Sequence, residues 1–371
     1  MRFRESSPLI IIPTIATIVA IFLTLFLTSD INSDLILSKL CGTSDIEVSD
    51  FYNRIRSGQS INPLSDDIIM VNVDTVYDRA ELASLITTIS KNSPEIIGID
   101  LLFEENKDEM ADSVLIQALS TADNIVVGQR YDESLQAICK DFVSEYCPDV
   151  NRGIVNLTTK TRHGIVREFT SFLGQDVAHP SLAVAMLKKI SSSKYNELLQ
   201  KDRNILIRFQ PEEYMVVEPD EIRQHPQIVK DKIIFVGTIT DEYDLHSTPL
   251  SDDYPGVQIH ANILSMVLHD DYVDKHSRIY TFILGIISAL ILTFMYVRLH
   301  STQNLVIRVI PILWLAAMVY LGCLAFNKWG LYINAPQTIL IASLALVVLD
   351  LWVAVESVFL KIKNRKSKAT K

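Results

Sequence analysis

Four long apolar blocks dominate the pattern of hydrophobic and polar positions along the chain. They cover residues 9–27, 279–297, 309–326 and 335–360. About 20 apolar residues, rising about 1.5 Å each, make a helix that crosses the ~30 Å hydrocarbon core of a bilayer. The pattern therefore predicts four transmembrane helices. A cleaved signal peptide is the alternative for the first block, but the run is longer than the usual ~7–15 residues and no A-x-A-like cleavage site follows it.

Lys and Arg in the short flanking segments indicate the orientation, because cytoplasmic loops carry an excess of these residues. Segments 1–8, 298–308 and 361–371 each hold two or more of them, whereas the loop 327–334 holds a single lysine. We therefore expect a multi-pass protein of the bacterial cell membrane with both termini in the cytoplasm. The long segment 28–278 then forms one extracytoplasmic domain.

Inside that long segment, short apolar runs alternate with amphipathic segments, as strands and helices do when they pack together. Strands are expected at 68–73, 96–101, 124–128, 204–209 and 232–236, and helices at 78–91, 108–121, 181–199 and 257–268. Residues 154–157 and 165–169 resemble the two strands of a hairpin. Strands and helices that alternate in this way predict a parallel sheet with right-handed crossovers.

The fold class is therefore an α/β domain, a mostly parallel sheet flanked by helices, together with four transmembrane α-helices. The runs at 68–73, 96–101, 204–209 and 232–236 are too apolar for a sheet with one face in water. We expect these four strands to lie in one sheet that is covered by helices on both faces.

Charge is unevenly distributed along the chain, whose formal net charge is −10. Segment 28–278 contains 41 acidic and 23 basic residues, and the remainder contains 3 acidic and 11 basic residues. An acidic domain is not expected to bind nucleic acid, which attracts basic surfaces. With 4 Cys, 12 Gly and 13 Pro, the chain is neither a disulfide-rich miniprotein nor collagen-like.

The most specific motif of the domain begins at Ile234 and ends at Asn262. It contains Ile-Phe-Val-Gly-Thr over 234–238, Thr248-Pro249, and Pro-Gly-Val-Gln-Ile-His-Ala-Asn over 255–262. In this order the motifs resemble the CHASE type-2 domain, an extracellular sensing domain associated with cyclases and histidine kinases. The resemblance covers about 67–272 and extends to the arrangement of one membrane helix before the domain and three after it. One departure is Arg162-His163, where the family usually has an acid.

The resemblance implies that the protein receives a signal at the membrane. Such domains usually continue into a cytoplasmic cyclase, kinase or other output domain, and none is recognisable between Leu360 and Lys371. We therefore expect a sensor that passes its state to a separate signalling partner in the cytoplasm or membrane. Outside, a small ligand or an envelope protein is expected, and a second copy of the chain is a further candidate partner.

Two other functions remain open at this point. An envelope docking or assembly protein is the first alternative, and a metal-dependent ectoenzyme is the second. A hydrolase needs a nucleophile with a positioned base, and the sequence has neither a Gly-x-Ser-x-Gly elbow nor a Cys–His protease signature. We therefore expect no enzymatic activity, no catalytic residue and no cofactor.

Four residues form a candidate ligand site at the ends of the predicted strands. Asp74, Asp100 and Thr238 end or follow three strands, and His260 lies near the start of the helix at 257–268. Ligands of open α/β sheets bind outside the carboxyl ends of the strands. The alternative is that the two acids cap the following turns and helices and that His260 is a structural hydrogen-bonding residue.

The loop between the last predicted strand and that helix carries acids and histidines that could bind Ca²⁺ or Zn²⁺. They are Asp241, Asp244, His246, Asp252, Asp253 and His260. Their spacing matches neither an EF-hand nor an HExxH pattern. We expect a solvated polar loop and predict no metal site.

Cys139 and Cys147 form a candidate disulfide in the exported domain, because an oxidising compartment permits one. A bridge over so short a loop would contribute less than ~3 kcal/mol by chain entropy. The free and bridged states both remain open. Cys41 is then left free, and Cys323 is expected to pack inside a membrane helix.

Asp350 and Glu356 are candidate polar positions within the last apolar block. An acid near the middle of a bilayer costs ~2.5–3.5 kcal/mol on insertion scales, so it usually faces a partner or a cavity. Glu356 can reach the interface near Lys361. For Asp350, either the bilayer segment ends near Leu349, or the carboxylate meets a hydroxyl such as Thr293 or Tyr320 or a helix of another chain.

Overall fold

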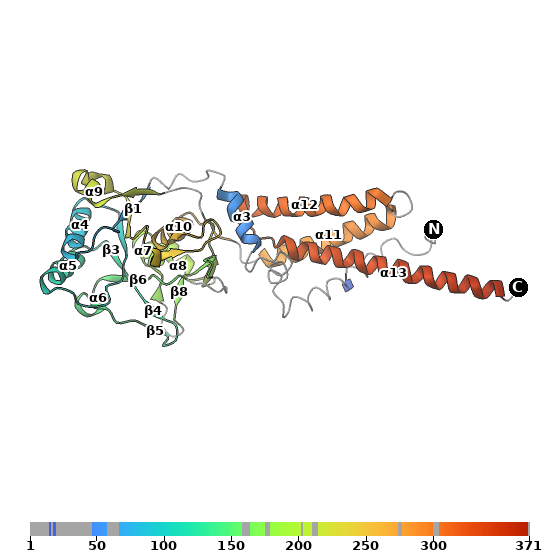
Figure 1. Cartoon of the computed structure of the whole chain (residues 1–371), viewed down its shortest axis with the longest axis horizontal. Helices are drawn as coiled ribbons and strands as arrows, with labels where there is room; N and C mark the ends of the chain where they lie inside the picture. The colour runs from blue at the N-terminus through green and yellow to red at the C-terminus, as the bar shows by residue number, and fades with distance from the viewer. Residues whose placement is uncertain are drawn as a thin grey trace. The chain divides into compact units, whose positions relative to one another are not determined.

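The computed structural model divides the chain into two compact units (Figure 1). Residues 53–273 make an α/β unit, and residues 1–52 with 274–371 make a helical unit. The structure describes residues 15, 18–19, 47–57, 67–157, 164–174, 179–201, 203–209, 214–273, 277–299 and 304–369. The predicted first transmembrane helix therefore lies outside the described residues except for Ile15, Ile18 and Val19, and Cys41 and Arg162-His163 lie outside them too.

Six strands form the main sheet of the α/β unit, in the order β11-β1-β12-β2-β3-β6. Their bounds are β11 Met215–Val217, β1 Ile68–Asn72, β12 Ile233–Gly237, β2 Ile96–Asp100, β3 Ile125–Gln129 and β6 Asn151–Ile154. Every neighbouring pair in this sheet is parallel. The predicted parallel α/β fold is confirmed, as are the strands expected near 68–73, 96–101, 124–128 and 232–236.

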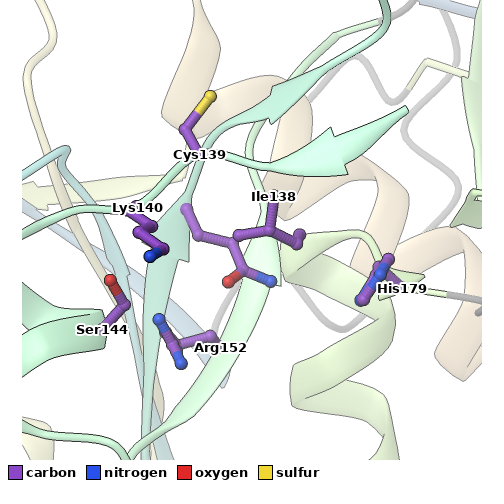
Figure 2. Close-up of a pocket in the computed structure, with 7 residues that line it drawn as sticks. Ile138, Cys139, Lys140, Ser144, Arg152 and His179 are labelled. Atoms are coloured by element: carbon purple, nitrogen blue, oxygen red, sulfur yellow. The ribbon is translucent and has the colours of Figure 1, made fainter. Parts of the chain in front are cut away.

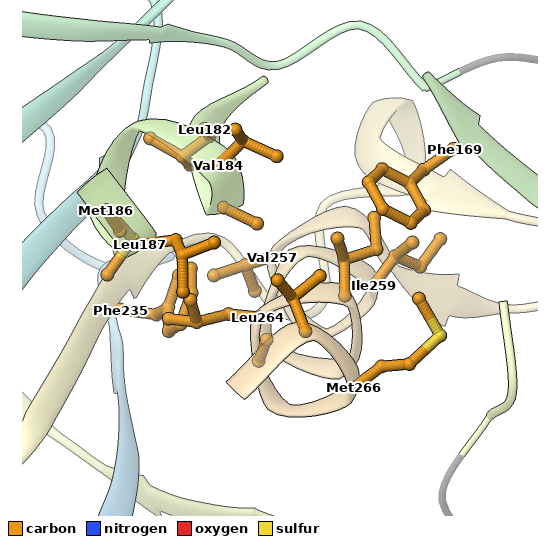
Figure 3. Close-up of a cluster of buried hydrophobic side chains, with 14 of the residues drawn as sticks. Phe169, Leu182, Val184, Met186, Leu187, Phe235, Val257, Ile259, Leu264 and Met266 are labelled. Atoms are coloured by element: carbon orange, nitrogen blue, oxygen red, sulfur yellow. The ribbon is translucent and has the colours of Figure 1, made fainter. Parts of the chain in front are cut away.

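Helices cover both faces of this sheet, as the apolar strands predict. Ile69 and Val71 point into a core shared with α4 (Arg79–Lys91), α5 (Glu109–Thr121) and α9 (Pro219–Gln224). Ile68 and Met70 point the other way, into a core shared with α7 (Leu182–Ile190) and α10 (Gly256–Leu268). Figure 1 shows α4 and α5 on one side of the strands and α7 and α10 on the other. Figure 3 shows Leu187 and Val257 meeting Phe235 of the sheet.

The remaining elements are short. They are α3 Val48–Ser57, α6 Phe142–Tyr146, α8 Ser192–Leu198, η2 Pro226–Val229 and η3 Glu242–Asp244, with the strands β4 Tyr131–Asp132, β5 Ala137–Ile138, β7 Glu168–Thr170, β8 Phe172–Leu173, β9 His179–Pro180, β10 Asn204–Leu206, β13 Leu245–His246 and β14 Tyr254–Pro255. These strands form four two-stranded sheets: β10-β7, β13-β14, β4-β5 and β8-β9.

Two strand predictions are wrong. The strand expected at 204–209 is β10, which pairs antiparallel with β7 and lies outside the six-stranded sheet. The expected hairpin of 154–157 with 165–169 does not form, because β6 instead pairs parallel with β3. Gly153 of β6 also allows a close approach of α7: a Cβ there would lie 2.5 Å from the Cα of Leu182, so only glycine lets α7 pack directly on β6.

The helices expected at 78–91, 108–121 and 257–268 are found, and the fourth expected helix is divided into two. Asp78 caps α4 by accepting from the backbone N–H of Ala80 at 3.1 Å. The helix expected at 181–199 is divided into α7 and α8 at Ser191. The side chain of Ser191 accepts from the backbone N–H of Lys194 and caps α8. Serine in this position favours starting a new helix over continuing the old one.

In the described part of the helical unit, three helices are long and apolar enough to cross a membrane. They are α11 (Ser277–Leu299), α12 (Asn304–Trp329) and α13 (Ala335–Ala369), and their apolar spans are Ile279–Val297, Val309–Trp329 and Ala335–Val355. The last three predicted spans are thus found as helices. With 35 residues, α13 is about 52 Å long at 1.5 Å per residue, well beyond the ~30 Å hydrocarbon core.

Small residues bring α11 and α13 close together. A Cβ on Gly285 would lie 2.6 Å from Cδ1 of Ile341. Ala289 and Ala345 are fully buried beside the same isoleucine. Helix pairs in membranes pack in this way because small residues let the two backbones approach.

Candidate functional site

Asp74 does not line a site but holds a loop. Its carboxylate accepts hydrogen bonds from the backbone N–H groups of Ile239 and Thr240, at 3.1 and 3.0 Å, and from the Thr240 hydroxyl at 2.8 Å. The acid that follows β1 therefore fixes the turn that follows β12. The role is structural, but the turn that Asp74 binds is distant in sequence and is not the following turn that the alternative named.

Asp100 and His260 form a buried pair at the carboxyl ends of the strands. Oδ2 of Asp100 lies 3.9 Å from Nε2 of His260, and the two side chains are only 7% and 2% exposed. Burial, with the nearby Asp244, raises the pKa of Asp100 well above its ordinary value. Burial also lowers the pKa of His260 to about 4. Burial therefore favours the uncharged form of both side chains, and the imidazole of His260 is uncharged at neutral pH.

Asp244 stands at the centre of the same cluster. Its carboxylate accepts a hydrogen bond from the Thr238 hydroxyl at 3.4 Å, and Nε2 of His246 lies 3.4 Å from its other oxygen. Gly256 opens α10 against it, since a Cβ there would lie 2.5 Å from Oδ1 of Asp244. The structure thus places Asp100, Thr238 and His260 near Asp244.

The cluster has unused hydrogen-bonding capacity. Oδ2 of Asp100 and Nδ1 of His260 are buried and have no hydrogen-bond partner. An acid and a base so close could exchange a proton with one another, but burial keeps both out of contact with a dissolved substrate. Within the described residues, no group of three or more His, Cys, Asp or Glu side chains is arranged to hold a metal ion.

An open cleft of about 340 Å³ lies elsewhere, at the edge of the sheet formed by β6 (Figure 2). Its lining residues come from β3, β5, β6, β9 and α6 and the segments next to them. They are Gln129, Ile138, Cys139, Lys140, Ser144, Arg152 and His179. This cleft was not among the sites expected from the sequence, because no motif joins these residues.

Cys139 and Cys147, the candidate disulfide pair, are both free thiols in the structure. Cys147 is buried at the end of α6, where the Ser120 hydroxyl donates to its sulfur at 3.7 Å and burial raises the pKa of the thiol. Cys139 instead lines the cleft. The two side chains thus belong to different environments, and the structure has the free state of the two that the sequence left open.

Asp350 has a partner that the sequence analysis did not name. The hydroxyl of Tyr296, on α11, donates to Oδ1 of Asp350 on α13 at 2.7 Å. Thr293, one of the hydroxyls considered, donates instead to the carbonyl of Ala289 in its own helix. Asp350 lies within the apolar span that ends at Val355. The side chain of Glu356 lies outside the described residues.

Asp271 joins two arginines of the α/β unit. Its carboxylate pairs with Arg56, near the end of α3, and with Arg208, shortly after β10. Both guanidinium groups are buried, and burial together with the neighbouring Arg56 lowers the pKa of Arg208 to about 10. Residues 53–57 and 271–273 are the first and last described segments of this unit. The ion pairs therefore connect the first segment of the α/β unit to its last segment.

These observations define a class of protein, an α/β domain with a filled strand-end cluster, carried on apolar helices of membrane-spanning length. A family model for the CHASE2 domain matches residues 19–299, and the chain belongs to this family of extracellular sensory domains. Comparisons with curated proteins and with solved structures found no match. The family assignment predicted from the motif at 234–262 is thus confirmed.

Proposed function

We propose that this protein is a membrane receptor whose extracytoplasmic α/β unit perceives a stimulus and whose helices pass the change to a separate partner. Membership of the CHASE2 family supports the sensory role. The proposal includes no catalysis: the buried Asp100–His260 pair is out of reach of substrate. It also includes an orientation with both termini in the cytoplasm, which the basic flanks favour.

The observation that carries the proposal is the ion-pair cluster around Asp271. Connecting segments enter and leave the α/β unit and offer a route for a change in it, and Arg56 and Asp271 lie on those two segments. Buried charges of this kind are stable only while they remain paired. A stimulus that shifts one segment therefore has to shift the other or break the pair.

The length of α13 gives the change a route to a partner. After the apolar span ends at Val355, the helix continues to Ala369. That extension adds about 21 Å at 1.5 Å per residue, and its sequence carries five basic residues. We propose that this extension lies in the cytoplasm and that the partner binds it or the exposed face of the span that precedes it.

The test is site-specific photocrosslinking of the full chain in native membranes. A crosslinking residue is placed at Leu351, Val355 or Val358, which are exposed on α13, with Leu313 on α12 as a comparison position. We expect one partner protein to be recovered from α13 positions and not from Leu313. In Arg56→Gln, which breaks one half of the cluster, recovery should change at least about twofold.

The matched control is Lys194→Gln, which removes the same charge from the neighbouring Lys194–Asp270 pair without touching Asp271. It should leave the crosslinks unaltered. Hydrogen exchange of β2 and β12 amides shows whether Arg56→Gln keeps its fold. Crosslinks that do not change in a folded Arg56→Gln protein would contradict the coupling. An envelope protein recovered from the α/β unit, with none from α13, would favour docking.

A further inference from the structure

The cleft at the β6 edge has a charge opposite to that of the domain around it. Segment 28–278 has 18 more acidic than basic residues. The cleft lining nevertheless includes Lys140 and Arg152 and contains no acid. Four of its seven side chains can donate a hydrogen bond from nitrogen: Gln129, Lys140, Arg152 and His179. The hydroxyl of Ser144 already donates to the carbonyl of Asp141 at 2.6 Å.

The two cations are incompletely matched by the protein itself. Lys140 is exposed and has no ion-pair partner among the described residues. Nη1 of Arg152 is buried without a hydrogen bond, and its nearest acid is Asp141, at 3.8 Å. That carboxylate already accepts from the backbone N–H of Ser144 at 2.7 Å. Because guanidinium and carboxylate pair best through short, aligned hydrogen bonds, this contact leaves Arg152 able to bind another anion.

The directions of the side chains agree with a shared ligand. Figure 2 shows the polar ends of Lys140, Ser144 and Arg152 gathered on one side of the cleft, with His179 on the other side. The volume, about 340 Å³, falls within the range of about 300–1,000 Å³ typical of small-molecule sites. Ile138 adds an apolar surface for the body of a molecule.

We propose that this cleft binds a small organic anion that carries a carboxylate or phosphate group. Lys140 and Arg152 hold the anionic group, and Gln129 and His179 contact the rest of the molecule. The site is distinct from the Asp100–His260 cluster. The inference does not depend on the proposed receptor function, because binding can be measured without any signal.

The experiment measures binding to the full chain in nanodiscs of zwitterionic lipid by calorimetry, with citrate and inorganic phosphate as probes. At least one probe should bind, and its affinity should fall as ionic strength rises, because salt screens exposed charges. Lys140→Gln should weaken binding about three- to tenfold, and Arg152→Gln about tenfold or more. The matched control, Lys230→Gln, removes an exposed lysine outside the cleft and should change the affinity less than twofold.

Cys139 supplies a second readout, because this residue lines the cleft and is partly exposed, while Cys147 is buried. The bound anion should slow alkylation of Cys139 by a neutral maleimide at least threefold in the unaltered protein and not in Lys140→Gln. Tighter binding of citrate indicates a carboxylate ligand, and tighter binding of phosphate indicates a phosphorylated one. If neither probe binds at 10 mM (about 10⁻² M, a very weak affinity), the proposal is overturned. It is also overturned if the probes bind Lys140→Gln as tightly as they bind the unaltered protein.

Discussion

Two polar places lie on the same sheet, one at the carboxyl ends of its strands and the other at its β6 edge, and they differ in what occupies them. At the ends of β2 and β12, Asp100 and His260 are buried, and burial moves both pKa values toward the uncharged forms. At the β6 edge, Lys140 and Arg152 line an open cleft, with Arg152 opposite Val127 of β3. Ligands of α/β sheets are expected at the carboxyl ends of the strands, but there the cluster is filled. The difference shows that a polar residue at a strand end marks a binding site only where the chain leaves room beside it.

The largest expected effect separates the two places by stability. His260→Ala leaves a cavity in a site that is almost fully buried, and we expect it to reduce the free energy of unfolding by about 2–4 kcal/mol. His179→Ala, in the open cleft, should cost less than about 0.5 kcal/mol. Hydrogen exchange of the slowest β2 and β12 amides in the full chain measures both. If both variants lost the same free energy of unfolding, the filled cluster and the open cleft would not differ in packing.

The second prediction concerns pH and depends on the opposite pKa shifts within the buried pair. His260 has a folded pKa of about 4, below its ordinary 6.5, so its contribution to stability is present above pH 6.5 and lost as pH falls toward 4. Asp100 has a raised folded pKa, so its contribution is present below pH 3.8 and lost as pH rises through the folded value. Between these limits the two contributions oppose one another.

The variants should therefore have opposite slopes. In Asp100→Asn only the histidine remains, and stability should rise with pH between about 4 and 6.5, by up to about 1.4 kcal/mol per pH unit. In His260→Gln only the acid remains, and stability should fall as pH rises above about 4. Urea titrations monitored by hydrogen exchange measure the slopes. If stability changed with pH in the same direction in both variants, the pKa values of Asp100 and His260 would not be shifted in opposite directions.

The third prediction compares two neighbouring parts of the cleft wall. Gly153→Ala should cost about 1–3 kcal/mol, because the new methyl group meets the backbone of Leu182 and α7 has to move. Lys140→Gln should change stability by less than about 0.5 kcal/mol while it weakens anion binding. Thermal melting of the full chain checks the first effect and calorimetry the second. If Gly153→Ala melts like the unaltered protein, α7 does not depend on that close approach.

The smallest effect on stability is expected in the helical unit, where Tyr296 and Asp350 of the same chain form a hydrogen-bonded pair. Tyr296→Phe removes the hydroxyl that donates to Asp350, and a single interhelical hydrogen bond in a membrane is worth about 0.6 kcal/mol on average. Asp350→Leu should weaken helix association more than Asp350→Asn, which keeps hydrogen-bonding capacity. Thermal melting in nanodiscs measures these differences. Asp350→Leu with unaltered association would show that the pair contributes nothing.

Local patterns in the sequence determined much of the fold. The apolar runs of β1, β2, β3 and β12 and the spans of α11, α12 and α13 are predicted by residues within one element. So is the Asp78 cap of α4. These features depend on burial and on hydrogen bonds a few residues away. The motif at 234–262 was also sufficient to identify the family.

Tertiary structure alone decided the partners of segments far apart in the chain. β10 was expected in the main sheet but pairs with β7, and β6 was expected in a hairpin but pairs with β3. Tyr296 reaches Asp350 across 54 positions. The sequence named Asp100 and His260, but their exclusion from water follows from the packing of α10 against the sheet. The cleft has no sequence signature, because its charge and volume arise where separate segments meet.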